Sequence, residues 1–305
     1  MENLKNKITK WFSSIINRTT EIIIQPDKET MNDFDDIKSD NVSGALELNN
    51  DAIEPFESIF EPRVESIESM DHYNRVRLQK EKLNDDEIDL LYDIVYITDK
   101  ILNENNIRYT IEGGTLLGAI RNGGMILHDN DADFDVLESD IDRILNLEKE
   151  FAKYNLVIII TPGWGLQISY KDSPDLAPNM WTDGTKSWTS KWPFLDLISI
   201  KFDGEKYICG GSVAISDYPD YYLTRDDWEK PFDKIKFGNL DLWVIAGHDN
   251  RINYLDRNYK NWDTMIEMVM DHRENVYFDK PIRCAFTEKD KRHNVRSDKP
   301  TKLNF

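Results

Sequence analysis

The stretch from residue 111 to residue 137, IEGGTLLGAIRNGGMILHDNDADFDVL, constrains the fold of this 305-residue chain more than any other segment. Although the chain already carries a net charge of -19, this stretch sets four aspartates at alternate positions: Asp129, Asp131, Asp133 and Asp135. Alternate side chains of an extended strand point to the same side. A strand over 131–137 would therefore carry acids on one face and send the other face into a hydrophobic core. Because like charges this close repel each other, the pattern predicts a cation among them.

A divalent metal ion is the cation that these acids favour. Carboxylates two residues apart on one strand lie about 7 Å apart and can lean toward one ion. Such oxygen ligands suit Mg²⁺ or Mn²⁺, which proteins hold with one or two carboxylates and substrate phosphates. A third acid, Asp196, lies in the apolar stretch FLDLISI, where an unpaired charge would cost several kcal/mol. We predict a metal site at Asp131, Asp133 and Asp196. The structural alternative for Asp196 is a salt bridge to Lys or Arg, or exposure at a strand end.

The glycine pair Gly113 and Gly114 stands between a predicted strand over 107–112 and a helix that we expect to begin near Thr115. Free N–H groups at the start of a helix can bind phosphate oxygens, and the missing side chains allow close approach. The Thr115 hydroxyl can donate a further hydrogen bond. The glycines thus predict an anion-binding turn near the acidic strand.

Two other interpretations of the acids remain open. One is a solvated acidic strand without a ligand. The other is a calcium loop, because four acids fall at positions 1, 3, 5 and 12 of an EF-hand window: Asp129, Asp131, Asp133 and Asp140. Position 6 is Phe134, where such a loop requires glycine, so the calcium loop is disfavoured.

The rest of the chain alternates helices and strands. Asn84 predicts a helix start, and apolar residues recur at helical spacing up to about residue 103. Ser139 can cap a helix to about Tyr154, and 251–270 is predicted to be mainly helical. Strands are predicted at 156–161, 165–170, 194–202 and 206–210, with a hairpin over 234–245. This order indicates an α/β (α+β) fold, a mixed β-sheet flanked by helices.

Three regions are predicted along the chain. Residues 1–24 form an amphipathic helix candidate, which either packs on the body or makes a peripheral membrane contact. Residues 25–80 are predicted to be an acidic flexible linker, since 27–71 hold fourteen acids against three bases. Residues 81–305 are expected to form the folded domain.

Composition excludes several classes of function. A net charge of -19 argues against nucleic acid as a partner, because no excess of Lys and Arg is available to neutralise phosphates. Two cysteines exclude a disulfide framework or a four-cysteine zinc site. No apolar run reaches the roughly 18 residues of a membrane span, and no signal-peptide pattern opens the chain. We therefore expect a cytoplasmic protein.

With these residues in place, YTIEGGTLLGAIRNGGMILHDNDADFDV resembles the signature of the LicD/fukutin family. Seven residues match the first block of that signature: Gly113, Gly114, Thr115, Leu116, Leu117, Gly118 and Arg121. Asp129, Asp131 and Asp133 match its acids, and Asp196 matches its later hydrophobic-Asp-hydrophobic element. Leu127 and His128 replace the usual Pro-Trp, which affects substrate identity more than metal binding.

The resemblance implies a nucleotidyltransferase-like catalytic domain over 81–305 that transfers a phosphorylated small alcohol, such as phosphocholine or ribitol phosphate. The donor would be CDP-activated and the acceptor a glycan hydroxyl, with Mg²⁺ or Mn²⁺ as cofactor. Asp129 or Asp135 would then accept the proton of the acceptor hydroxyl beside the three metal ligands, and Arg121 would bind phosphate. The resemblance also makes Gly118 a substrate-binding residue, with His128 and Trp188 as further candidates.

Two alternatives stay open at this point. The same metal chemistry would serve a nucleotidyltransferase that acts on a small molecule or a protein. A catalytically silent module that binds glycans or protein partners would keep the cleft without the chemistry.

Overall fold

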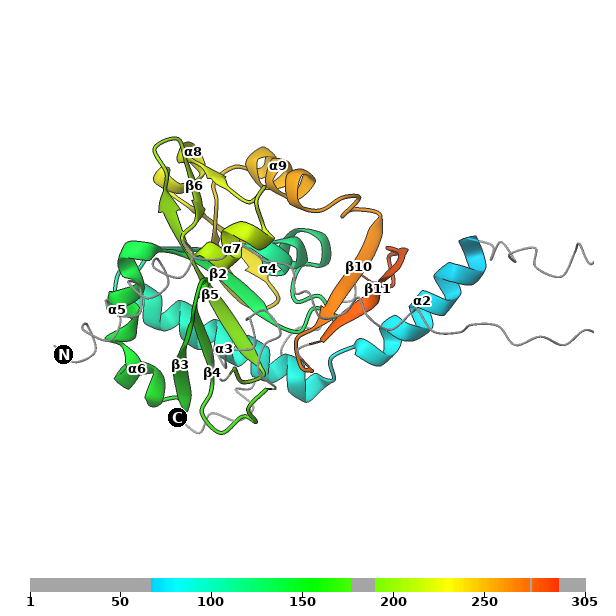
Figure 1. Cartoon of the computed structure of the whole chain (residues 1–305), viewed down its shortest axis with the longest axis horizontal. Coiled ribbons are helices and arrows are strands. Elements are labelled where there is room, and N and C mark those ends of the chain that lie inside the picture. The colour runs from blue at the N-terminus through cyan, green and yellow to red at the C-terminus, as the bar shows by residue number, and fades with distance from the viewer. Residues whose placement is uncertain (1–66, 177–189, 275, 291–305) are drawn as a thin grey trace, which may run out of the picture. The chain divides into compact units, whose positions relative to one another are not determined.

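A mixed sheet of seven strands holds the acidic strand between two neighbours. The computed structural model describes residues 67–176, 190–274 and 276–290. Five strands follow one another across the sheet in the order β1 (Tyr109–Ile111), β2 (Ala132–Leu137), β5 (Phe194–Phe202), β4 (Gly165–Tyr170) and β3 (Leu156–Thr161). Beyond β5 the sheet continues through β6 (Lys206–Cys209) and β7 (Leu223–Thr224). The predicted α/β fold with a mixed sheet flanked by helices is confirmed (Figure 1).

The register between β2 and β5 sets two acids side by side. These two strands run parallel, whereas the other paired strands of this sheet run antiparallel. Asp133 is the register partner of Asp196. In a parallel pair, partners at one register position send their side chains to the same face, so both carboxylates face one side of the sheet.

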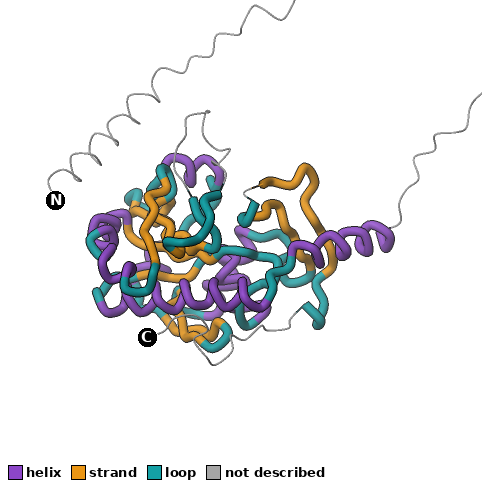
Figure 2. Tube along the Cα trace, turned by 90° about the horizontal axis from the view of Figure 1, so that it is seen from below, coloured by secondary structure: helices purple, strands orange, loops and turns teal. Residues whose placement is uncertain are grey.

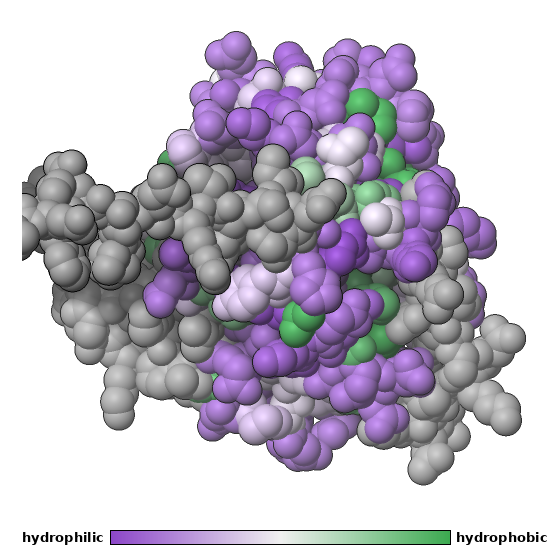
Figure 3. All heavy atoms as spheres, turned by 90° about the vertical axis from the view of Figure 1, so that its right-hand side faces the viewer, coloured by the Kyte–Doolittle hydropathy of each residue, from purple (hydrophilic) through white to green (hydrophobic). Residues whose placement is uncertain are grey.

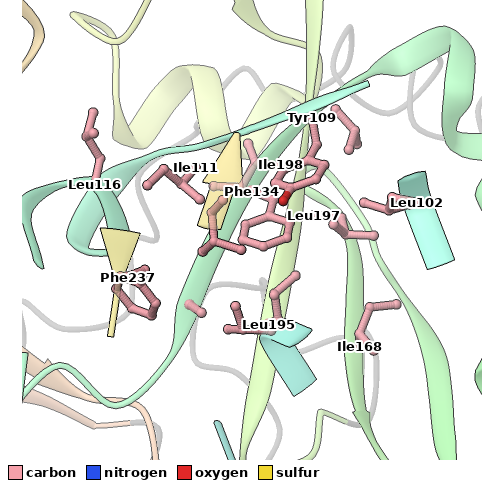
Figure 4. Packing of buried hydrophobic residues seen from close by; sticks show 14 of the residues in the cluster. Leu102, Tyr109, Ile111, Leu116, Phe134, Ile168, Leu195, Leu197, Ile198 and Phe237 are labelled. Atoms are coloured by element: carbon pink, nitrogen blue, oxygen red, sulfur yellow. The ribbon is translucent and has the colours of Figure 1, made fainter. Parts of the chain in front are cut away.

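The opposite face of the same strands builds the core. Phe134 stacks on Tyr109 with ring centroids 4.3 Å apart, and Leu195 and Leu197 are fully buried beside them. Figure 4 shows these side chains together, with Leu102 of the helix that precedes β1 at the edge of the cluster. The strict alternation of acid and apolar residues thus matches the two faces of the central strands.

Helix α3 (Asp85–Glu104) begins where its cap predicts. The Asn84 side chain accepts the Glu87 N–H at 3.0 Å, and the Glu87 carboxylate accepts the Asn84 N–H at 2.8 Å. These two bonds satisfy two N–H groups that a helix start leaves free. The buried side of α3 packs against β4 and β5, so the helix covers one face of the sheet.

Short helical elements complete the sheet region. Those described are α4 (Gly113–Leu117), the π-helix η1 (Gly118–Asn122), the 3₁₀ helix η2 (Glu138–Asp140), α5 (Ile141–Leu145), α6 (Glu148–Ala152), α7 (Ser212–Asp217) and α8 (Arg225–Glu229). The single helix predicted from Ser139 to Tyr154 is therefore divided into η2, α5 and α6. Asn146 follows the end of α5, where its backbone N–H and its side-chain amide both donate to the Asp142 carbonyl.

The prediction of a mainly helical region over 251–270 is wrong for its second half. Helix α9 (His248–Asn258) ends before Asn261, which has a positive φ of 56°. Strand β10 (Met265–Asp271) follows and pairs with β11 (Val276–Ala285), and the predicted hairpin forms from β8 (Asp233–Phe237) and β9 (Leu240–Val244). Ile266 and Met268 are buried while Glu267 is exposed, which is the two-residue period of a strand.

Helix α2 (Ile67–Glu81) occupies the end of the segment 25–80 that was predicted to be a flexible linker. Leu78 is buried with Ile266, Met268, Ile282 and Cys284 in a second, smaller core, which explains why this end is helical. Figures 1 and 2 show α2 beside the β10–β11 hairpin. The helix candidate over 1–24 and the rest of the predicted linker lie outside the described residues.

The described surface on the side of this hairpin is mostly hydrophilic, with small and scattered hydrophobic groups (Figure 3). Among the described residues, none of the helices has the length and apolar content needed to cross a membrane.

Candidate metal centre

A cavity of about 480 Å³ lies over the acidic side of the sheet. It is lined by β2 and β5, by the start of α4, by residues of α9 and by the β10–β11 hairpin. Asp129, Asp131, Asp133 and Asp196 all face it. The tertiary structure therefore gathers acids from two separated segments in one cavity.

The predicted trio of metal ligands is brought together. One carboxylate oxygen from each of Asp131, Asp133 and Asp196 lies within 4.8 Å of the others. Among the described residues no Lys or Arg forms a salt bridge with these three acids, so the paired-charge alternative for Asp196 is not found there. The donor set is all oxygen, which fits a hard divalent cation.

Burial raises the pKa of every acid in this group. The pKa of Asp129 rises to about 7 and that of Asp131 to about 6, chiefly through desolvation. The pKa values of Asp133 and Asp196 rise well above their ordinary value, because desolvation adds to repulsion from Asp131. A divalent cation would offset this repulsion and return the carboxylates to their charged form.

The glycine turn allows the acids to approach the start of α4. A Cβ at Gly114 would lie 1.8 Å from Asp129 Oδ2, and one at Gly113 would lie 3.0 Å from Asp133 Oδ2. Gly113 also has a positive φ of 56°, which favours glycine. Both residues line the cavity, as predicted for a phosphate-binding turn.

Thr115 and Gly118 face the protein interior instead of the cavity. The Asp133 N–H donates to Thr115 Oγ1 at 2.9 Å, so the threonine fixes the start of β2. A Cβ at Gly118 would lie 2.5 Å from the Gly124 carbonyl oxygen, so this glycine serves close backbone packing. The structure does not bring these two predicted substrate-binding residues to the cavity wall.

Arg121 and His128 line the cavity in restrained positions. Arg121 Nη1 donates to the carbonyls of Trp262 at 2.8 Å and Met265 at 3.1 Å, and the guanidinium lies 4.5 Å from the Phe286 ring centroid. Burial lowers the pKa of Arg121 to about 10. Burial also lowers the pKa of His128 to about 3, with repulsion from Arg121 adding to it, so this imidazole is neutral. Trp188 lies outside the described residues.

Two other acids of the segment lie apart from the site. Asp135 shares the face of Asp133 but is fully buried and accepts a hydrogen bond from Tyr221, away from the cavity lining. Asp140, at the end of η2, pairs with Arg143 of α5. Because residues 132–137 are an extended strand, the calcium-loop interpretation is wrong.

Two cavity residues were missed by the sequence interpretation. Glu112 stands directly before the glycines, and its Oε2 accepts a hydrogen bond from Tyr254 Oη at 2.7 Å. Desolvation raises the pKa of Glu112 to about 7. His272, from the turn between β10 and β11, places Nε2 3.4 Å from Asp131 Oδ2. No local pattern around Glu112 or His272 indicated that either side chain would reach the acids.

The mixed sheet, the acidic cavity and the glycine turn define an α/β protein with a candidate metal centre at the face of its central parallel strands. Residues 106–244 match the family model described as "LicD/FKTN/FKRP, nucleotidyltransferase domain", and this match supports membership of the LicD family through that domain. Members of this family are generally transferases. The match ends with β9, before α9 and the β10–β11 hairpin.

Two curated relatives are similar to the chain over 62% of its length. One is an uncharacterized protein of Rickettsia prowazekii (strain Madrid E), 26% identical over 188 residues. The other is an uncharacterized protein of Rickettsia typhi (strain ATCC VR-144 / Wilmington), 26% identical over 194 residues. The aligned part covers 60% of the first relative and 51% of the second, so the chain spans only part of each.

Proposed function

We propose that this chain is a metal-dependent transferase that moves a phosphorylated small alcohol from a CDP-activated donor to a glycan hydroxyl. The observation that carries the proposal is the meeting of Asp131, Asp133 and Asp196 within 4.8 Å beside a glycine turn. Membership of the LicD family supports the transferase class.

Each element of the cavity has a role in this proposal. Asp131, Asp133 and Asp196 would hold Mg²⁺ or Mn²⁺, which would neutralise the charge of a bound diphosphate and polarise its phosphorus–oxygen bonds. The backbone at Gly113 and Gly114 would approach the phosphates closely, since no side chain intervenes. Lys260 and Arg121 supply positive charge at the wall.

Proton transfer from the acceptor hydroxyl requires a base near neutrality. Glu112 and Asp129 line the cavity with pKa values of about 7. Glu112 is the better base, because Tyr254 holds its carboxyl in one orientation.

The test is turnover of CDP-ribitol and CDP-choline by the full chain, read as CMP release with and without Mn²⁺. Asp133→Asn and Asp196→Asn keep side-chain volume but remove a ligand charge, so each should lower Mn²⁺-dependent CMP release by at least about 100-fold. Asp241→Asn is the matched control, because Asp241 is exposed and pairs only with a surface lysine. Activity retained by Asp196→Asn would defeat the proposal.

The same assay separates the other two functions. Release of pyrophosphate from CTP or ATP in place of CMP from a CDP-alcohol would identify a nucleotidyltransferase. Binding of a glycan without either product, and without any response to Mn²⁺, would identify a binding module.

A further inference from the structure

A second group of possible metal ligands adjoins the acidic trio and differs from it in chemistry. Asp129, Asp131 and His272 place one ligand atom each within 4.8 Å of one another. Asp131 belongs to both groups and is only 9% exposed. The imidazole comes from the turn after β10, beyond the segment 106–244 that matches the family.

A chain of hydrogen bonds sets the orientation of the His272 ring. Arg273 Nε donates to Asp271 Oδ1 at 3.2 Å, and the Asp271 carboxylate therefore acts only as an acceptor. Asn130 is fully buried and donates its amide to Asp271 Oδ1 at 2.6 Å. The oxygen of this amide must then point the other way, toward His272.

The Asn130 oxygen takes two bonds from His272. It lies 3.1 Å from the backbone nitrogen and 2.8 Å from ring Nδ1. Because that oxygen can only accept, Nδ1 carries a hydrogen. The ring is further fixed edge-on to Phe194, with centroids 6.0 Å apart at 86°. A histidine whose far nitrogen donates to a polar oxygen has the arrangement that proteins use to orient a metal ligand.

The other ring nitrogen faces the acids. Nε2 lies 3.4 Å from Asp131 Oδ2, so the lone pair of an imidazole held in this way points at a carboxylate. Two groups of lone pairs repel each other unless a proton or a metal ion lies between them. The presence of Asp129 as a further oxygen ligand at the same place favours a metal ion over a single proton.

We infer that Asp129, Asp131 and His272 form a second divalent-cation site, joined to the first by Asp131. This inference rests on the proposed function, which assigns a divalent cation to the first site at Asp131, Asp133 and Asp196. Because imidazole nitrogen suits transition metals such as Zn²⁺ better than Mg²⁺ or Ca²⁺, the second site selects a transition metal. The hairpin outside the family match thus supplies the residue that determines which metal the centre accepts.

The test uses Mn²⁺ and the full chain, and it detects ligand nitrogen by pulsed EPR without any assay of turnover. Wild-type protein with two equivalents of Mn²⁺ should show a directly bonded ¹⁴N nucleus. His272→Asn should lose this coupling, whereas His248→Asn, which alters an exposed histidine on α9, should retain it. Asp129→Asn leaves the ring in place and should weaken Mn²⁺ binding at the nitrogen-containing site roughly tenfold or more.

Three outcomes would overturn the inference: no ¹⁴N coupling in the wild type, coupling that survives His272→Asn, or coupling that is lost in His128→Asn. The first would mean that only a proton lies between the imidazole and the acids. Asp196→Asn separates the two hypotheses, since it should remove the all-oxygen site while the ¹⁴N coupling stays. If Asp196→Asn left both Mn²⁺ stoichiometry and turnover unchanged, the proposed function would fail although the nitrogen site stood.

Discussion

At the scale of residues, some acids of the candidate metal centre can be predicted from the sequence, whereas other residues that line it cannot. Asp131 and Asp133 alternate with apolar residues, so their common face follows from strand geometry. Asp196 stands out because a lone acid interrupts an apolar run. Glu112 and His272 have no such local signature, because their importance depends on Tyr254 and Asn130, which are distant in sequence.

Tyr254→Phe tests how the buried Glu112 carboxyl is held. Tyr254 Oη donates to Glu112 Oε2 at 2.7 Å, and the Gly113 N–H donates to the same hydroxyl at 3.3 Å. Losing the hydroxyl leaves a buried carboxyl without its donor, so the free energy of unfolding should fall by about 1–3 kcal/mol in urea titrations. Tyr222→Phe is the control and should change it by less than about 0.5 kcal/mol, since Tyr222 is only half-buried. Equal losses in both variants would contradict the assigned role of Tyr254.

At the scale of elements, helix caps, apolar spacing and turn residues predicted the helices and strands that depend mainly on local interactions. The Asn84 cap and the apolar spacing after it predicted α3, and the short glycine-bounded stretches predicted the strands of the sheet. Helix α2 was missed because its apolar residues are sparse and its buried apolar anchor, Leu78, packs on a hairpin about 190 residues later. Strand β10 was predicted to be helical because its alternation of buried and exposed residues is short. It also begins only a few residues after the end of α9.

Gly114→Ala and Gly118→Ala form a matched pair in α4 and η1. At Gly114 the new methyl group meets the end of the Asp129 side chain at 1.8 Å, which can swing away. We expect weaker Mn²⁺ binding by calorimetry with nearly unchanged thermal stability. At Gly118 the methyl group meets a backbone carbonyl at 2.5 Å, which cannot move without shifting the chain. This variant should lose about 1–3 kcal/mol of stability. The reverse pattern would refute the assignment of the two glycines.

Leu78→Ala tests whether α2 belongs to the folded body. Leu78 is 1% exposed in the small core with Ile266 and Ile282, so the cavity left by truncation should cost about 2–5 kcal/mol in chemical denaturation. Val76 lies on the same helix but is 47% exposed. Val76→Ala should therefore change the unfolding free energy by no more than about 0.5 kcal/mol. If Leu78→Ala were equally mild, α2 would not be anchored to the hairpin.

At the scale of the whole molecule, the buried acids are expected to couple stability to pH and, under the proposed function, to metal. An acid with a raised pKa keeps its proton in the folded state while the unfolded chain releases it. Stability therefore falls as pH rises from the ordinary value to the folded value, a window from about 4 to about 7 for Asp129 and Glu112. Asp271 and Asp290 behave oppositely, because hydrogen bonds lower their pKa against the effect of burial: Arg273 donates to Asp271, and Thr287 donates to Asp290.

We expect metal-free protein to melt at a lower temperature at pH 7.5 than at pH 5, by roughly 4 °C or more, because each kcal/mol corresponds to about 2–4 °C at this size. Mn²⁺ at pH 7.5 should raise the melting temperature again, since it binds the folded state only. Asp133→Asn should melt higher than wild type in EDTA and gain less from Mn²⁺. Calorimetric scans at the two pH values measure all of these effects. A melting temperature that is the same with EDTA and Mn²⁺ at pH 7.5 would contradict the metal centre.

The sequence by itself determined the alternating acidic strand, the glycine turn before α4 and the α/β class, and it singled out the acids Asp131, Asp133 and Asp196, because each follows from local periodicity or from the cost of a lone charge in an apolar run. Only the tertiary structure decided that Asp133 stands opposite Asp196, that Tyr254 holds Glu112, and that His272 reaches Asp131. These contacts join residues far apart in the chain, and their free energy depends on burial and partners that exist only after folding.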